Sequence, residues 1–153
     1  MSDDRLKRGF ASAAKYCAFR ERAPKQVREK LLSWDFKEEE VEEIIQRLLD
    51  EKFLDEARFA RAFCHDKFEF NHWGKVKIKM EMGRYDLSYQ VMEDALNAIN
   101  EEKYLDVIHN LTHKKWNSVK DKGEEYLQKR KVADYMMRKG FEGDQVWKVI
   151  KQL

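Results

Sequence analysis

The stretch Leu31-Leu32-Ser33-Trp34-Asp35-Phe36 decides the fold, because its pattern returns twice further along the chain. Residues 82–87 read Met-Gly-Arg-Tyr-Asp-Leu, and residues 136–141 read Met-Met-Arg-Lys-Gly-Phe. Each copy has an apolar residue first, Asp or Gly in fifth place and a large apolar residue last. Asp and Gly tolerate the left-handed backbone that ends helices, and an apolar contact across the ending is typical of a Schellman motif. We therefore predict a helix end at all three sites.

The apolar positions around these helix ends repeat along the whole chain. Shifting the sequence by 51 residues, and then by a further 54, keeps these positions apolar without a gap. In the first copy they are Val27, Leu31, Phe36, Val41, Ile45 and Leu48. Steps of three and four residues within each copy indicate amphipathic helices. The sequence therefore predicts an all-α fold of three tandem three-helix repeats, forming an elongated, slightly curved molecule.

We place the three repeats at residues 1–54, 55–105 and 106–153. Each begins with a helix of its own, and the first covers roughly residues 10–20. Small residues would give this helix a packing surface: Ala11, Ala14 and Ala18. Pro24 then suits the first turn of the following helix, where a missing N–H costs nothing.

Two aspartates are the predicted N-caps of the later repeats. Asp55 precedes the second repeat's first helix, and Leu54 is placed to pack on Phe59. Asp106 is the matching residue of the third repeat, but the apolar partner is missing there. We therefore expect less order at the start of the third repeat, and a loop or frayed helix end over residues 116–123.

Composition narrows the class of protein. Of 153 residues, 42% are hydrophobic and 39% charged, with one proline and six glycines, which favours amphipathic helices. The net charge is only +2, although residues 106–153 carry 11 basic and 7 acidic side chains. No apolar run approaches the roughly 20 residues of a membrane span, and no signal peptide is visible. We expect a cytoplasmic protein without a membrane partner, in which Cys17 and Cys64 are buried, reduced thiols.

The sequence offers no apparatus for catalysis. It has neither a glycine-rich phosphate loop nor a nucleophile elbow. Asp106, His109 and His113 could share a helix face, but no third or fourth metal ligand can be identified. The glutamates at positions 38–40 suit the start of a helix, where the macrodipole favours acidic groups. We predict a protein that is not an enzyme and that holds no metal or cofactor.

Basic clusters are the remaining candidates for binding. They comprise Lys75, Lys77 and Lys79 with Arg84 close behind, then Lys114 and Lys115, and then Lys129, Arg130 and Lys131. Such runs are often plain solvated faces. The functional interpretation is contact with DNA phosphates or with an acidic protein surface. Apart from Trp73 and Trp116, few aromatic residues lie among these basic residues. This argues against a dedicated platform on which single-stranded bases would stack.

Several motifs together resemble a known family. They are residues 14–24, which contain Arg-Glu-Arg-Ala-Pro, residues 53–60 (Phe-Leu-Asp-Glu-Ala-Arg-Phe-Ala), Gly74 with Ile78 and Met82, and residues 136–141. Over roughly residues 10–151 the chain resembles the RecX family of RecA recombinase regulators. Two departures stand out. Residues 83–85 replace the usual helix end, so an irregular turn is expected there, and Pro24 replaces the usual serine.

The resemblance implies a regulator that binds the RecA filament on single-stranded DNA and restrains it. On that view the basic clusters of the second and third repeats face the filament groove or its DNA. Charge reversal at Lys75, Lys77 and Lys79 would then weaken binding. A helical module that binds single-stranded or duplex DNA without the recombinase is the competing interpretation.

Overall fold

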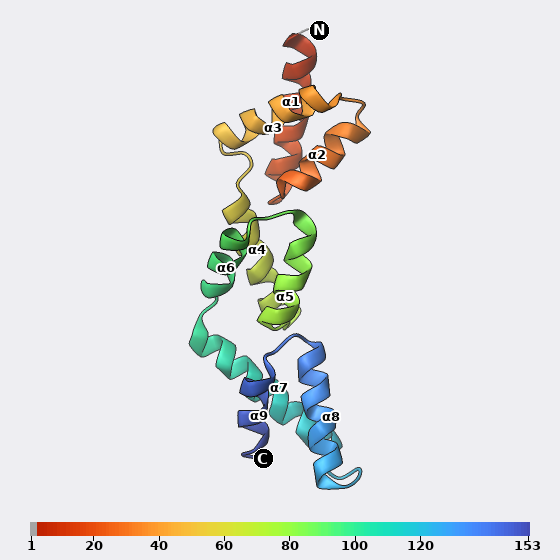
Figure 1. The fold of residues 1–153 in the computed structure, drawn as a ribbon, viewed down its shortest axis with the longest axis vertical. Helices are drawn as coiled ribbons and strands as arrows, with labels where there is room; N and C mark the ends of the chain where they lie inside the picture. The colour runs from red at the N-terminus through yellow and green to blue at the C-terminus, as the bar shows by residue number, and fades with distance from the viewer. Residues whose placement is uncertain (1–2) are drawn as a thin grey trace. The chain divides into compact units, whose positions relative to one another are not determined.

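The computed structural model describes residues 3–153, which form nine α helices and one 3-10 turn, with no β strand in that range (Figure 1). The elements are α1 (Asp3–Phe19), α2 (Pro24–Ser33), α3 (Glu38–Asp50), α4 (Glu56–Glu69), α5 (Lys75–Met82), η1 (Gly83–Tyr85), α6 (Tyr89–Asn97), α7 (Glu101–Val119), α8 (Glu125–Arg138) and α9 (Gly143–Ile150). The predicted all-α class and its three sets of three helices are confirmed.

The helices gather into two compact units, and the division falls inside the second repeat. The first unit runs up to Ala62 and includes Met82–Met92, whereas the second comprises Phe63–Glu81 and Glu93–Leu153. Helices α4 and α6 each continue from one unit into the other. The junction between the first and second repeats therefore lies within the first unit, and the junction between the second and third lies within the second unit.

The three predicted helix ends are confirmed. The residues in fifth place have positive φ angles of 66° at Asp35, 55° at Asp86 and 96° at Gly140. In the first repeat, the Phe36 N–H donates to the Leu31 carbonyl oxygen at 3.2 Å. The third repeat has the same bond, also 3.2 Å, from Phe141 to Met136. This is the defining bond of the Schellman motif. The second repeat reaches Asp86 through η1, which is the irregular turn expected there.

The inward face of α1 differs from the prediction. Ala11 and Ala18 are exposed, and only Ala14 packs against the core. The helix buries Gly9, Ala13 and Cys17 instead. It begins at Asp3, seven residues before the predicted start, and its earlier turns bring Leu6 and Gly9 against the core. At Gly9 a Cβ atom would lie 2.6 Å from the Phe36 ring, so a larger residue there would have to displace that ring.

The first helix of the third repeat also starts earlier than predicted. The Asn100 side chain accepts a hydrogen bond from the Lys103 N–H at 2.9 Å, which makes Asn100 the N-cap of α7. Asp106 is exposed inside the helix, so its predicted capping role is wrong. The helix runs without a break from Glu101 to Val119 and buries Tyr104, Ile108 and Thr112. Of residues 116–123, predicted as a loop or a frayed helix end, residues 116–119 are the last helical residues of α7 and residues 120–123 form a turn.

Candidate interaction surface

The predicted lysines of α5 differ in how much charge they leave available. The Lys75 ammonium lies 3.5 Å from the Glu101 carboxylate, and that of Lys79 lies 2.6 Å from Glu93. Lys77 pairs with no carboxylate among the described residues and lies 4.4 Å from the centre of the Trp73 ring. Of this cluster, Lys77 therefore has the charge that is most available to a partner.

Arg84 does not belong to the same compact unit as the other predicted cations. It lies in η1, in the first unit, and its side chain is exposed. Its carbonyl oxygen accepts a hydrogen bond from the Lys25 ammonium at 2.8 Å. The structure thus gives this residue a main-chain role in joining the η1 turn to α2.

The remaining predicted cations lie on α7 and α8. Lys129 lies 3.6 Å from the Glu125 carboxylate, one helical turn away, and 5.9 Å from the Trp116 ring centre. The other four have no ion pair with a carboxylate within residues 3–153; they are Lys114, Lys115, Arg130 and Lys131. The third repeat consequently has more available positive charge than α5.

A groove between α7 and α8 brings two of these cations together. It has a volume of about 220 Å³ and is lined by Lys115, Val119, Lys131, Asp134 and Arg138. Three cations and one carboxylate make it basic, and it suits an anionic group better than an apolar one. Arg138 is not among the binding candidates predicted from the sequence, although its spacing of seven from Lys131 places the two on one helix face.

Lysines lie over more aromatic rings than the sequence suggested. Trp73 has both Lys67 and Lys77 near its ring, at 5.0 and 4.4 Å. Tyr135 likewise has Lys115 at 4.7 Å and Lys139 at 5.8 Å. These cation–π contacts place lysine ammonium groups over the rings. The prediction that the chain lacks a dedicated stacking platform remains a prediction.

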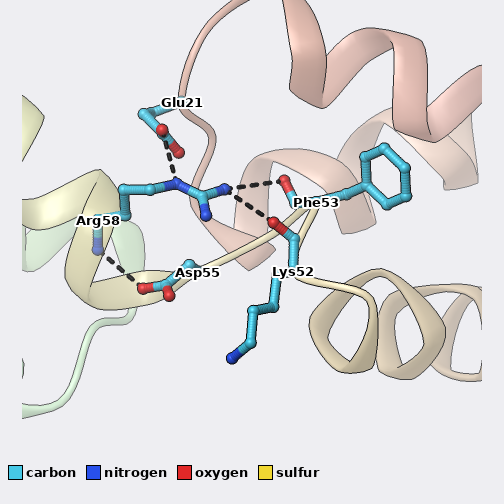
Figure 2. A network of polar contacts seen from close by, with 5 residues as sticks. All are labelled: Glu21, Lys52, Phe53, Asp55 and Arg58. Carbon is cyan, nitrogen blue, oxygen red and sulfur yellow. Dashed lines mark hydrogen bonds and ion pairs between the residues drawn. The ribbon is translucent and has the colours of Figure 1, made fainter.

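The motif at residues 53–60 joins the first repeat to the second (Figure 2). Asp55 accepts a hydrogen bond from the Arg58 N–H at 2.8 Å, which confirms Asp55 as the N-cap of α4. The Arg58 guanidinium binds Glu21 at 2.7 Å and donates to the carbonyl oxygens of Lys52 and Phe53 at 3.1 and 3.3 Å. One arginine thus connects the α1–α2 and α3–α4 loops. This motif therefore has a structural role.

Main-chain hydrogen bonds join the second repeat to the third. The Gly74 N–H donates to the Lys139 carbonyl oxygen at 2.7 Å, and the Val76 N–H donates to that of Gly140 at 3.0 Å. These N–H groups lie at the start of α5, where a helix cannot satisfy them itself. The end of α8 therefore caps α5, and this cap positions the lysines of that helix.

A buried tyrosine completes the same junction. The Tyr104 hydroxyl accepts a hydrogen bond from the Lys75 N–H at 2.9 Å and donates one to the Glu142 carboxylate. Its ring packs against Phe68 and Phe141, with centroids 5.6 Å apart in both pairs. Burial raises the pKa of Tyr104, and the hydrogen bond to Glu142 acts in the same direction. The hydroxyl therefore stays protonated and able to donate.

The other candidate groups can be placed as well. His109 and His113 stack with ring centroids 4.2 Å apart, and within residues 3–153 no three metal-ligating side chains come together. Cys17 and Cys64 are buried and form no disulfide within residues 3–153, and burial raises the pKa of Cys64 to about 12. No helix in the described part of the chain is both long and apolar enough to span a membrane.

The fold defines an all-α protein of three tandem three-helix domains whose candidate binding residues are surface cations. Three family models match it in order. "RecX, first three-helix domain" matches residues 10–48, the second domain matches residues 55–96, and the third matches residues 101–150. This chain belongs to the RecX family.

Curated relatives carry the name "Regulatory protein RecX". The protein of Clostridium acetobutylicum is 26% identical over 84% of this chain, and that of Halalkalibacterium halodurans is 27% identical over 91%. A Clostridium botulinum relative is 30% identical over 84%. The matched regions span 61%, 52% and 60% of these relatives' own lengths. The chain thus spans between about half and three fifths of the curated relatives that it matches.

A solved structure has the same fold. The crystal structure of RecX from Lactobacillus salivarius aligns with a TM-score of 0.90 over 99% of this chain and 98% of that one, at 23% identity. A second crystal structure, of a regulatory protein RecX, aligns with a TM-score of 0.86 over 98% of this chain. At these identities the likeness establishes the fold alone.

Proposed function

We propose that this chain is a regulatory protein that binds the RecA filament on single-stranded DNA and modulates it, mainly by inhibition, in recombination and DNA repair. The observation that carries the proposal is the succession of three RecX domains over residues 10–150. Curated relatives named as regulatory proteins support it. The role is binding and regulation, without a chemical step of its own.

The surface cations suit contact with a polymer of recombinase and DNA. Lys77 on α5, together with Lys114, Arg130 and Lys131 on α7 and α8, keeps a charge that no described carboxylate neutralises. Several weak contacts along a repeating filament reinforce one another through a high effective concentration. Contacts to phosphates or acidic side chains weaken as salt rises.

Charge reversal of the whole α5 cluster is a poor test, because it also breaks ion pairs within the protein. Reversing Lys75 or Lys79 sets like charges against Glu101 or Glu93. Lys77→Glu alone avoids this complication. We expect it to weaken filament binding and to flatten its salt dependence.

A DNA-binding module that acts without the recombinase is the second candidate, favoured by the basic groove between α7 and α8. Fluorescence anisotropy separates the two functions. A labelled single-stranded oligonucleotide is titrated with this protein, first bare and then coated with recombinase. The proposal predicts tighter binding to the coated strand at the same salt concentration. Equal or tighter binding to the bare strand contradicts it and favours the second candidate.

A further inference from the structure

The outward face of α8 combines exposed apolar side chains with basic ones. Its apolar members are Tyr126, Leu127 and Met137, which are 59%, 53% and 50% exposed. Its charged members are Arg130, Lys131, Asp134 and Arg138. Steps of three, four and seven residues place these seven side chains, which we call the α8 face, on one side of the helix.

The α8 face is separate from the side of the helix that holds the fold together. α8 buries Gln128, Val132, Ala133 and Met136 on its inward side. The α8 face contributes no side chain to that buried set. The end of the Met137 side chain lies beside Gly143 at the start of α9. Even so, about half of the surface of Leu127 and of Met137 stays uncovered, on the same side of the helix as the cations.

The charges of the α8 face are available to a partner. Within residues 3–153 no carboxylate forms an ion pair with Arg130, Lys131 or Arg138. Lys131 and Arg138 also line the groove shared with α7, where Lys115 adds another cation. The face and the groove together have a clear excess of positive charge, which is complementary to an acidic surface.

The apolar members favour a protein partner over nucleic acid. A phosphodiester backbone would use the cations but would leave Leu127 and Met137 without complementary contacts. A protein surface can supply both apolar pockets and carboxylates, which is how amphipathic helices are recognised through anchors spaced along one face.

We infer that the α8 face docks onto an acidic protein surface that has apolar pockets. Leu127 and Met137 enter the pockets, and Lys131 and Arg138 bind carboxylates at the mouth of the α7–α8 groove. Resting on the proposed function, the inference assigns this partner surface to a recombinase protomer in the filament.

Two double variants of the full chain test the inference in the anisotropy assay. Leu127→Ser with Met137→Ser removes the apolar anchors, and Lys131→Glu with Arg138→Glu reverses the charges. The matched controls are Leu105→Ser, at a 45% exposed apolar residue on α7, and Lys148→Glu with Lys151→Glu at exposed lysines near the C-terminus. Thermal melts by circular dichroism check that each variant is folded, which we expect because the altered side chains are exposed.

The apolar variant is expected to bind the recombinase-coated strand about tenfold more weakly, since buried anchors dominate protein interfaces. Its affinity for the bare strand stays within twofold of the wild type. The charge variant also loses about tenfold on the coated strand, and both controls stay within twofold on both ligands.

Three results would overturn the inference. If the apolar variant binds the coated strand like the wild type, the α8 face is not a protein-docking surface. If both double variants lose the same affinity on bare and coated strands, the partner is nucleic acid. If the wild-type chain fails to bind the coated strand at all, the proposed function falls, and the assignment to a recombinase protomer falls with it.

Discussion

The two junctions between consecutive repeats are built by different chemistry. In the first unit, the charged side chain of Arg58 binds Glu21 and two loop carbonyl groups, and the two ionic side chains are about one third exposed (Figure 2). In the second unit, main-chain N–H groups of α5 bind the end of α8, and the hydroxyl of the buried Tyr104 completes the set. The first junction is ionic and partly exposed to solvent, whereas the second is formed by main-chain groups and a buried hydroxyl.

This difference indicates how each junction responds to salt and to substitution. Partly exposed ion pairs are screened by salt and contribute about 1 kcal/mol or less. A buried donor that loses its acceptor costs about 1–3 kcal/mol, and two backbones packed together leave no room for an added carbon. The second junction should therefore be the less tolerant of substitution.

Gly140→Ala is the most damaging single change that we expect. The φ of Gly140 is 96°, and a Cβ atom there would lie 2.3 Å from the Cβ of Lys77. Backbone strain and overpacking each cost up to about 3 kcal/mol, so we expect the free energy of unfolding to fall by about 3 kcal/mol. Urea unfolding followed by tryptophan fluorescence measures it. Gly83→Ala is the control, because no atom lies within 4 Å of the added carbon there. Equal stability of the two variants would show that the close packing at Gly140 is not required.

Tyr104→Phe tests the hydroxyl of the second junction without removing its ring. The Lys75 N–H loses its acceptor and the Glu142 carboxylate loses its donor. We expect a loss of about 2 kcal/mol in the same urea assay. Tyr126→Phe, at an exposed tyrosine, should change stability by less than about 0.5 kcal/mol. A Tyr104→Phe protein as stable as the wild type would mean that the hydroxyl is dispensable.

Arg58→Ala tests the first junction. It removes one ion pair and two hydrogen bonds to loop carbonyl groups, and we expect a loss of about 1 kcal/mol at low salt. The loss should shrink as salt rises, because the ion pair of the wild type is screened. Arg61→Ala, at an exposed arginine one turn away on the same helix, serves as the control. A loss that is independent of salt would argue against an ionic junction.

Acid should act chiefly on the first unit, and this is the smallest effect that we predict. The Lys37 N–H lowers the pKa of Glu40, to which Arg5 adds an ion pair, and the Arg28 guanidinium lowers the pKa of Glu42. A carboxyl whose pKa is lower in the folded state stabilises the fold above its ordinary value of 4.5. That contribution disappears as pH falls through the folded-state pKa.

Glu40→Gln tests this dependence. Urea midpoints of the wild type and the variant are compared at pH 7 and at pH 3.5. The wild type should lose more of its midpoint between the two pH values than the variant loses, because the variant has no carboxyl to protonate at position 40. A variant that is as sensitive to acid as the wild type would contradict the assignment.

Local rules explain which parts of the fold could be predicted. The left-handed positions at Asp35, Asp86 and Gly140 were found because a helix end depends on a few neighbouring residues. Analogy with Asp55 predicts Asp106 as a cap, but Asn100 already caps the helix earlier. Repeats of one pattern share their buried positions more faithfully than their caps, because each cap needs only one suitable side chain.

The candidate surface was less predictable, because it depends on contacts between distant segments. The partners that partly neutralise α5 are Glu93 on α6 and Glu101 on α7. Nothing in the spacing of the lysines indicates those partners. The α7–α8 groove likewise brings Lys115 beside Arg138, 23 residues further along the chain. Charge runs point to α5, α7 and α8 as candidates, but only the folded structure separates paired cations from available ones.

The most direct measurement is the ATPase rate of the RecA recombinase on single-stranded DNA, titrated with this protein at fixed salt. The proposed function predicts that this protein lowers the steady-state rate progressively until the effect saturates. The Lys131→Glu, Arg138→Glu double variant should need a higher concentration for the same effect. A rate that stays unchanged at concentrations of this protein well above that of the recombinase would contradict the proposed function.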